Sequence, residues 1–400
     1  MVATPCGFEP HHRHQKYPHL STDKCGYFFI ETEKYNMSTN ELQSCREEIS
    51  RIDREMADLF VQRMRVVEQI ADYKRERAMP IFDAEREKML LEQGAGRIED
   101  KGLRDYYSLY QQGVMQVAKL YQQRLLNGLR VAYAGVEGAF AHMAARSFYP
   151  DAGHIPFPDF ESAYRAVCTG DCDAVVLPLE NSYAGEVGQV TDLIFSGPLF
   201  MNGTLDLAVT QDLLVLPGTK KEDITEVLSH SQALNQCRDY IRRCGWKETA
   251  FENTAMAAEF VAAAGKKNLA AIASSEAAEL YGLEVLERGI NESSRNTTRF
   301  AVLSRSEDRN AASAHGAHFV LMFTVRNEAG SLARALNIVG AHGFNMRSLR
   351  SRPMKELLWQ YYFYLEAEGN VRGYEGKCML EEMAVCCDRL KVAGSFVARG

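Results

Sequence analysis

The chain has 400 residues, of which 46% are hydrophobic and 25% are charged, which is typical of a soluble globular protein with two or three domains. Its formal net charge of −7 argues against a general nucleic-acid binder, and without an apolar run of about 18 residues no segment is expected to span a membrane. The ten cysteines lack the paired CxxC spacing of zinc sites, so we expect no metal site, reduced thiols and a cytoplasmic protein.

Residues 1–36 differ in composition from the rest of the chain. Several histidines crowd there with Cys6 and Cys25, and the stretch has no sustained apolar core of the kind that a secretory signal needs. We expect a disordered extension, or upstream sequence translated before a start at Met37. A metal-binding tail is the alternative.

A single helical pattern runs from Thr39 to Arg77. Ser38 and Glu41 form a capping-box pattern at its start, and Pro80 marks its end. The apolar residues recur at helical spacings and form one stripe, made of Ile49, Ile52, Met56, Leu59, Phe60, Val67 and Ile70.

Three basic residues fall on or beside this apolar stripe. Arg63 and Lys74 project onto its centre, and Arg46 projects near its edge. Because an unpaired buried cation is costly, these residues predict an anionic ligand. The alternative is that their long side chains reach solvent from the helix surface.

Two shorter helices are predicted over 84–93 and 103–126, with a break at Gly94-Ala95-Gly96. The first helix would be about 55 Å long at about 1.5 Å per residue, which is too long to pack on itself within so small a unit. We therefore expect an intertwined homodimer or a higher homo-oligomer, in which each long helix lends its surface to its twin.

Residues 37–127 resemble the all-helical class of chorismate mutase. The matching positions are Arg46, Arg63, Lys74, Asp83, Arg86, Glu87 and Gln122. The resemblance implies a site for a dicarboxylate, to which Arg46 reaches from the partner subunit and in which Asp83 contributes to binding. It also implies that Arg63 and Arg86 bind the carboxylates. Lys74 and Gln122 would contact the ether oxygen, and Glu87 would contact the hydroxyl.

The rearrangement in that family needs neither a nucleophile nor a cofactor. It needs a compact substrate conformer and stabilisation of charge on an oxygen, which guanidinium and ammonium groups supply. Ala118 stands where the family often has serine, one helical turn before the glutamine. Whether Gln122 or Gln123 faces inward stays open at this point.

Residues 128–304 alternate short apolar strands with helices, which predicts an α/β domain. The predicted strands cover 129–134, 174–177, 226–228, 269–273 and 300–304. Polar residues follow several of these strands. In an open α/β sheet that edge holds the ligand, and helix N-termini attract anions.

This region resembles prephenate dehydratase along its whole length. Its signatures are Glu180-Asn181-Ser182 followed by Gly185, the stretch from Ser229 to Cys237, and Thr297-Thr298-Arg299-Phe300. The resemblance implies two α/β lobes, similar to a periplasmic binding protein, with the site in the cleft. Thr298 would assist the leaving hydroxyl and Arg299 would bind a carboxylate. Binding and orienting roles are implied for Glu180, Asn181, Ser182, Ser229, Gln236, Glu252 and Thr254.

Residues 317–400 follow a polar linker over 304–315. Strands are predicted at 319–325, 346–351, 359–366 and 392–397, and helices at 332–342 and 381–389. This βαββαβ order is ferredoxin-like and resembles the ACT regulatory module, which binds amino acids between paired modules. The resemblance implies phenylalanine as the effector, bound by Gly330, Ser331, Leu332, Ser351, Arg352 and Pro353.

One position of this module departs from the family pattern. Arg350 stands where the family motif has glutamate, which reverses a charge beside the expected amino-acid site. Feedback by phenylalanine is therefore expected, with its strength left open. A module that only dimerises is the alternative.

The predicted fold is multidomain: an all-α intertwined helical mutase domain, a two-lobed α/β dehydratase domain like a periplasmic binding protein, and an α+β ferredoxin-like ACT domain. The predicted function is the conversion of chorismate to prephenate and of prephenate to phenylpyruvate, without a cofactor and under phenylalanine control. Two alternatives stay open. The central domain could act on arogenate, or the chain could be a small-molecule sensor without chemistry.

Overall fold

A computed structural model describes residues 39–292, 296–312, 314–354 and 360–399. The expectations for residues 1–36 and for Ser38 lie outside the described residues, as does the predicted first residue, Trp359, of the strand over 359–366. The chain divides into two compact units, with the boundary between Arg63 and Met64.

Helix α1 spans Thr39–Glu76, close to the predicted range, and crosses that boundary. In the single chain most of its apolar stripe is open to solvent, with exposed fractions of 58% for Ile49 and 63% for Leu59, whereas Val67 is buried. An apolar stripe left open to this extent is unusual for a protein that works as a monomer.

Helices α2 (Ala84–Gly96) and α3 (Lys101–Asn127) pack against each other in the second unit. The predicted break comes three residues too early, because α2 includes Gly94-Ala95-Gly96 and ends at Gly96. A Cβ atom at Gly94 would lie 2.0 Å from Oε1 of Gln111 on α3, so glycine here serves the close approach of two helices. No helix in the described part of the chain is long and apolar enough to cross a membrane.

The first lobe of the α/β domain is built on a mixed sheet with the strand order β2-β1-β3-β11-β5. Alternate residues face two cores: Val176 and Val302 pack with α4, whereas Leu177 and Ala301 pack with α5 and α6. The elements of this lobe are β1 (Arg130–Ala134), α4 (Phe140–Phe148), β2 (Gly153–Phe157), α5 (Phe160–Thr169), β3 (Ala174–Asn181), β4 (Gly185–Glu186), α6 (Gly188–Ser196), β5 (Phe200–Ala208) and β11 (Thr297–Ser304).

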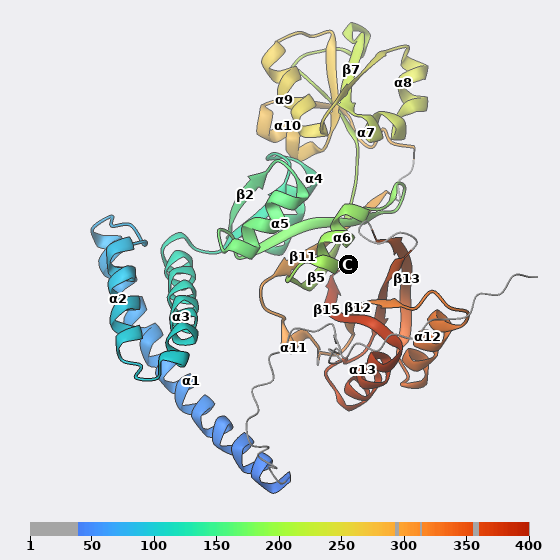
Figure 1. Ribbon diagram of the computed structural model, residues 1–400. Helices are drawn as coiled ribbons and strands as arrows, with labels where there is room; N and C mark the ends of the chain where they lie inside the picture. The colour runs from blue at the N-terminus through green and yellow to red at the C-terminus, as the bar shows by residue number, and fades with distance from the viewer. Residues whose placement is uncertain (1–38, 293–295, 313, 355–359, 400) are drawn as a thin grey trace, which may run out of the picture. The chain divides into compact units, whose positions relative to one another are not determined.

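The second lobe has a five-stranded sheet in the order β10-β6-β9-β7-β8. Helices α7 and α8 pack on one face with Leu213 and Ile272, and α9 and α10 pack on the other with Leu214 and Ala271 (Figure 1). Its elements are β6 (Asp212–Val215), η1 (Lys221–Asp223), β7 (Glu226–His230), α7 (Ser231–Gln236), α8 (Arg238–Cys244), β8 (Lys247–Phe251), α9 (Thr254–Ala264), β9 (Leu269–Ala273), α10 (Ser275–Tyr281) and β10 (Glu284–Glu287).

Strand β3 extends beyond its predicted end at Leu177, through Pro178, to Asn181. The proline is tolerated because the pairing with β11 shifts there: Phe300 pairs with Pro178 and Arg299 with Glu180. The predicted site residues on either side of this shift therefore lie in paired strands rather than in loops. Sequence analysis also missed β2, α5, β4, α6 and β5 of the first lobe.

The carboxy-terminal region has the strand order β13-β14-β12-β15, and Ala398 of β15 pairs in parallel with Thr204 of β5, so its sheet continues that of the first lobe. The helix expected over 381–389 is misplaced, because Cys387 and Arg389 pair with β12 as strand residues. The elements here are α11 (Arg309–Ala312), β12 (Ala317–Val325), α12 (Ser331–Ala341), β13 (Asn345–Pro353), β14 (Tyr361–Glu368), α13 (Tyr374–Cys386) and β15 (Cys387–Arg399).

Candidate functional site

Two predicted mutase residues, Arg46 and Arg63, belong to the first unit and lie on α1. Arg46 is exposed, whereas Arg63 is half-buried. Nη1 of Arg63 is buried and has no hydrogen-bond partner among the described residues. Because a buried guanidinium nitrogen without an acceptor is costly, this position favours an anion brought by a ligand or by another chain.

In the second unit, the backbone around α2 holds further predicted residues. Lys74 is half-buried and donates from Nζ to the carbonyl oxygen of Ile81 at 2.6 Å. Asp83 caps α2 by accepting from the backbone N–H of Arg86 at 2.9 Å. Glu87 in the same turn pairs with a lysine of α3 at 3.1 Å. Asp83 thus fixes the helix turn that carries Arg86 and Glu87.

Gln122 is the inward-facing member of the glutamine pair on α3. It is 7% exposed, and Gln123 is half-buried. The Oε1 atoms of both residues are buried and lack a hydrogen-bond partner in the described ranges of the chain. The open amide of Gln122 is therefore a polar group in an otherwise packed position, as a ligand-binding side chain would be.

A cavity of about 410 Å³ lies between the two lobes of the α/β domain, within the roughly 300–1,000 Å³ usual for small-molecule sites. The first lobe contributes the carboxyl end of β3 and the start of β11, and the second contributes the starts of α7 and α9. The polar residues of its wall are Asn181, Gln211, His230, Gln232, Gln236, Glu252, Asn253, Thr254 and Thr298.

The two strands of the first lobe place one predicted pair of residues at the cavity and turn another pair away. Thr298 of β11 pairs with Asn181 of β3 in the sheet, and both line the cavity. Arg299 and Glu180 are their neighbours and do not line it. Successive strand residues point to opposite faces, which accounts for the division.

Two serines that were also predicted as binding residues lie outside this wall. Ser229 is fully buried and donates to the carbonyl oxygen of Ile272 at 2.5 Å, which joins β7 to β9. Ser182 accepts at 3.0 Å from the backbone N–H of Thr297. This geometry does not favour direct contact between either serine and a ligand in the cavity.

Positive potential in the cavity comes from the backbone. Among the described residues that line it there is no lysine or arginine. Helices α4 and α9 begin at Phe140 and Thr254 on the wall, and helix N-termini attract anions. No side chain caps α4, so its first N–H groups stay open to a carboxylate.

Arg299 is bound by carboxylates of the protein itself, which corrects its expected role. Its Nε and Nη2 donate to the two carboxylate oxygens of Asp206 on β5, at 2.7 and 2.9 Å, and its Nη1 lies 3.9 Å from Oε2 of Glu366 on β14. The hydrogen bonds with Asp206 raise the pKa of Arg299 above its ordinary value. The arginine links the first lobe to the carboxy-terminal sheet and does not reach the cavity.

Glu180 is likewise engaged outside the cavity. Its carboxylate accepts a hydrogen bond from Nη2 of Arg350 on β13. Two residues along, Arg352 donates from Nε to Asp192 of α6 at 3.1 Å. The β13 segment that sequence analysis assigned to effector binding thus binds carboxylates on β3 and α6 of the first lobe.

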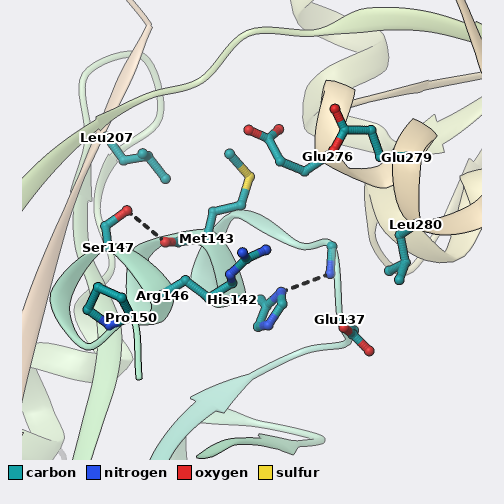
Figure 2. A pocket seen from close by; sticks show the side chains of 11 residues that line it. Glu137, His142, Met143, Arg146, Ser147, Pro150, Leu207, Glu276, Glu279 and Leu280 are labelled. Atoms are coloured by element: carbon teal, nitrogen blue, oxygen red, sulfur yellow. Dashed lines mark hydrogen bonds between the residues drawn. The ribbon is translucent and has the colours of Figure 1, made fainter. Parts of the chain in front are cut away.

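A second cavity, of about 490 Å³, holds none of the predicted residues (Figure 2). Three carboxylates, those of Glu137, Glu276 and Glu279, line it together with Arg146 and His142. Nδ1 of His142 accepts from a backbone N–H at 3.2 Å, and burial lowers the pKa of this histidine. Its excess of carboxylates makes this cavity a poorer site for a dianion than the cavity that holds Thr298.

A third cavity, of about 380 Å³, lies in the carboxy-terminal region beside the start of α12. Leu332 lines it, and Gly330 and Ser331 form the helix start, with Gly330 at φ 83° in the left-handed region. Ser351 and Pro353 lie on β13 and do not line it. The two halves of the predicted effector motif are therefore not brought to one cavity in the single chain.

Three polar residues near Thr298 were not assigned a role from sequence. His230 lies inside a signature stretch and Asn296 directly precedes another, so the motifs could have pointed to them. Gln211 lies on the crossover between the lobes, where no motif or periodicity marks it. No group of three or more histidine, cysteine, aspartate or glutamate side chains in the described ranges could hold a metal ion.

Comparisons with known proteins divide the chain in the same way. Residues 45–123 match the family chorismate mutase type II, and residues 131–308 match the family prephenate dehydratase. A bifunctional chorismate mutase/prephenate dehydratase of Enterobacter agglomerans is 31% identical over 376 residues, which is 89% of this chain and 96% of that protein. Arogenate dehydratase 3 of Arabidopsis thaliana is 34% identical over 68% of this chain and 67% of its own length.

A solved structure supports the fold of the second unit. The prephenate dehydratase of Arthrobacter aurescens, determined in complex with L-Phe, covers 67% of this chain and 90% of its own, with a TM-score of 0.61 and 24% identity. The α/β region therefore has the two-lobed fold that the sequence predicted. On the strength of the match over nearly its whole length, the chain belongs to the family of bifunctional chorismate mutase/prephenate dehydratases.

Proposed function

We propose that this chain converts chorismate to prephenate in its helical region and prephenate to phenylpyruvate in its α/β domain, as a bifunctional enzyme. The observation that carries the proposal is the pair Asn181 and Thr298, which face the cavity between the two lobes of the region that matches prephenate dehydratase. Neither reaction needs a cofactor. Both need a site that holds a dicarboxylate and stabilises negative charge on oxygen.

In the dehydratase reaction the bond from the ring to the carboxylate breaks as carbon dioxide leaves. Its electron pair enters the ring, which becomes aromatic, and the ring hydroxyl departs. Thr298 donates a hydrogen bond to that oxygen as it takes up negative charge. The substrate carboxylates lie toward the open N-terminus of α4 and the start of α9, which supply the positive potential that Arg299 does not.

In the mutase reaction the protein folds the enolpyruvyl arm over the ring. Arg63 and Arg86 bind the two carboxylates, and Arg46 comes from a second copy of the chain. Lys74 and Gln122 donate to the ether oxygen and Glu87 addresses the ring hydroxyl. The open buried nitrogen of Arg63 supports its role.

The mutase domain is an intertwined dimer in this proposal. The stripe on α1 is exposed in the single chain, and so are several residues of α3, with exposed fractions of 71% for Tyr106 and 65% for Leu109. A second α1 packed on these faces would cover them and bring Arg46 to its place.

The carboxy-terminal region is an ACT-type regulatory module with ferredoxin-like order, and its effector is phenylalanine. Its observed elements follow the order strand, helix, two strands, helix, strand. The cavity beside Leu332 is of a size for one amino acid, and the β13 segment of a second module would complete it. The Arthrobacter aurescens relative was determined with L-Phe bound, which supports the choice of ligand.

Arogenate is the second candidate substrate of the α/β domain. It carries an ammonium group where prephenate has a keto group, and Glu252 is a carboxylate on the cavity wall that could receive it. Side-by-side kinetics on the two compounds decide between them. If Glu252→Gln lowers kcat/KM for arogenate about tenfold and for prephenate by less than twofold, arogenate is the substrate.

One pair of variants tests the bifunctional proposal. Arg63→Ala should lower mutase activity at least about 100-fold and leave dehydratase activity within about twofold, and Thr298→Ala should do the reverse. The assays follow chorismate loss and phenylpyruvate appearance with the purified full chain. A fall of both activities in both folded variants would contradict the division of labour between the domains.

A further inference from the structure

We infer that Asn296 is a positioning residue for the dehydratase step: it passes the fixed orientation of the Asn181 amide on to Gln236, so that Gln236 turns its NH₂ group toward the substrate. Asn296 is 4% exposed, immediately precedes β11 and is not part of the cavity wall. The inference rests on the proposed function, because it concerns the same cavity.

The orientation of the Asn181 amide is fixed by the backbone. The N–H groups of Tyr183 and Ala184 donate to one side-chain atom of Asn181, at 3.0 and 2.9 Å. Since a backbone N–H can only donate, that atom is the oxygen Oδ1, and Nδ2 points the other way. These two donors therefore determine which atom of the Asn181 amide is oxygen and which is nitrogen.

The two hydrogens of Asn181 Nδ2 then have defined acceptors. One hydrogen bond goes to Oγ1 of Thr298 at 2.9 Å, and the other goes to Oδ1 of Asn296 at 2.9 Å. Because Nδ2 is a donor only, the hydroxyl hydrogen of Thr298 cannot point back to it. That hydrogen is available to an acceptor in the cavity, such as the departing hydroxyl of the substrate.

Asn296 connects the Asn181 amide to the side chain of Gln236. With Oδ1 of Asn296 accepting from Asn181, its Nδ2 donates to Oε1 of Gln236 at 3.0 Å. Gln211 adds a longer contact to that oxygen, at 3.4 Å. Gln236 lines the cavity, and with its oxygen engaged the group that it has left for a ligand is its NH₂. Asn296 therefore sets the direction of the Gln236 donor, although Asn296 itself does not line the cavity.

A double-mutant cycle in the full chain tests the inference. Asn296→Ala should lower dehydratase kcat about 10- to 100-fold in the native background, because the NH₂ group of Gln236 is then no longer directed at the substrate. In the Gln236→Ala background the same change should alter kcat by less than about twofold, because the donor that Asn296 positions is already gone. Equal effects in the two backgrounds would mean that Asn296 only supports the fold, and would overturn the inference.

The control variant is Asn202→Ala, which removes an asparagine that donates to Ser304 at 2.7 Å at the far end of β11. It should leave kcat within about twofold. Mutase activity of each variant serves as an internal check that the chain is folded. If Thr298→Ala itself kept full dehydratase activity, the proposed function would fail. If only the cycle were additive, the positioning role alone would fail.

Asn296→Asp supplies a second readout that does not depend on loss of the side chain. A protonated carboxyl group can still donate to Gln236, whereas an ionised one cannot. KM of this variant should therefore rise with pH across a range in which the KM of the native enzyme is flat. A KM profile that follows the native one at every pH would contradict the role assigned to the contact with Gln236.

Discussion

Single residues on β3 and β11 have different tasks because a strand alternates its faces. Asn181 and Thr298 face the cavity, and their neighbours Glu180 and Arg299 face the carboxy-terminal region. The charged residues of the two signatures therefore serve the contact between the first lobe and the carboxy-terminal sheet. The uncharged polar residues Asn181 and Thr298 line the cavity.

The ion pair between Arg350 and Glu180 gives a test at this scale. Arg350→Glu places two carboxylates together and should lower dehydratase kcat/KM a few-fold, because exposed or half-buried pairs are worth about 0–1 kcal/mol. Adding Glu180→Arg should restore most of the loss. Steady-state kinetics of the single and double variants measure it.

Arg347→Glu is the matched control, since Arg347 also lies on β13 but pairs with Glu368 of its own sheet. This control should leave dehydratase kinetics unchanged. Unchanged kinetics in Arg350→Glu as well would show that the pair does not couple the carboxy-terminal region to the cavity.

At the scale of elements, the two helices of the carboxy-terminal region are joined by a titratable group. His342 at the end of α12 hydrogen-bonds Glu375 at 3.0 Å and lies 3.2 Å from Glu382, both on α13. The hydrogen bond to Glu375, with that to Glu382, raises the pKa of His342 above its ordinary 6.5. Folding thus favours the protonated form, which also suits the negative end of α12.

This pairing predicts a pH-dependent stability. The contribution of His342 is complete below its unfolded pKa and is lost as pH rises through the raised folded pKa. The unfolding temperature of His342→Gln should therefore lie below that of the native chain at pH 5.5 and approach it at pH 9, measured by calorimetry at both values. An equal deficit at the two pH values would exclude an electrostatic contribution of the histidine.

At the scale of the whole molecule, the exposed apolar stripe of α1 sets the expected assembly. Leu59→Glu puts a charge in the stripe and should lower mutase activity at least about tenfold, with dehydratase activity kept within about twofold. Activity assays and sedimentation of the full chain measure this. Asp58→Lys, on the adjacent exposed position, is the control and should change neither activity.

Sedimentation of the native chain tests the predicted dimer independently of the variants. A mass of at least two chains is expected at concentrations where the mutase is active. A native chain that sedimented as a monomer with full mutase activity would contradict the intertwined dimer.

Much of this protein could be predicted from its sequence. The helical period of α1, the strand and helix alternation of the central region and the three signatures are local patterns, and local patterns are what a sequence records directly. They placed Arg63 on its stripe and the βαββαβ order at the end of the chain, and they marked Asn181 and Thr298, which line the cavity between the lobes. The match to both enzyme families confirms the predicted bifunctional family.

The tertiary structure decided what each charged residue meets. Arg299 was expected to bind a carboxylate of the substrate and instead binds Asp206, because the strand begins before Thr298 and turns Arg299 to the opposite face. The contact of Glu180 with Arg350 joins positions far apart in the sequence, which no local pattern encodes. The orientation of Thr298 depends on amides from separate strands and crossovers, and only folding brings those amides within hydrogen-bond distance.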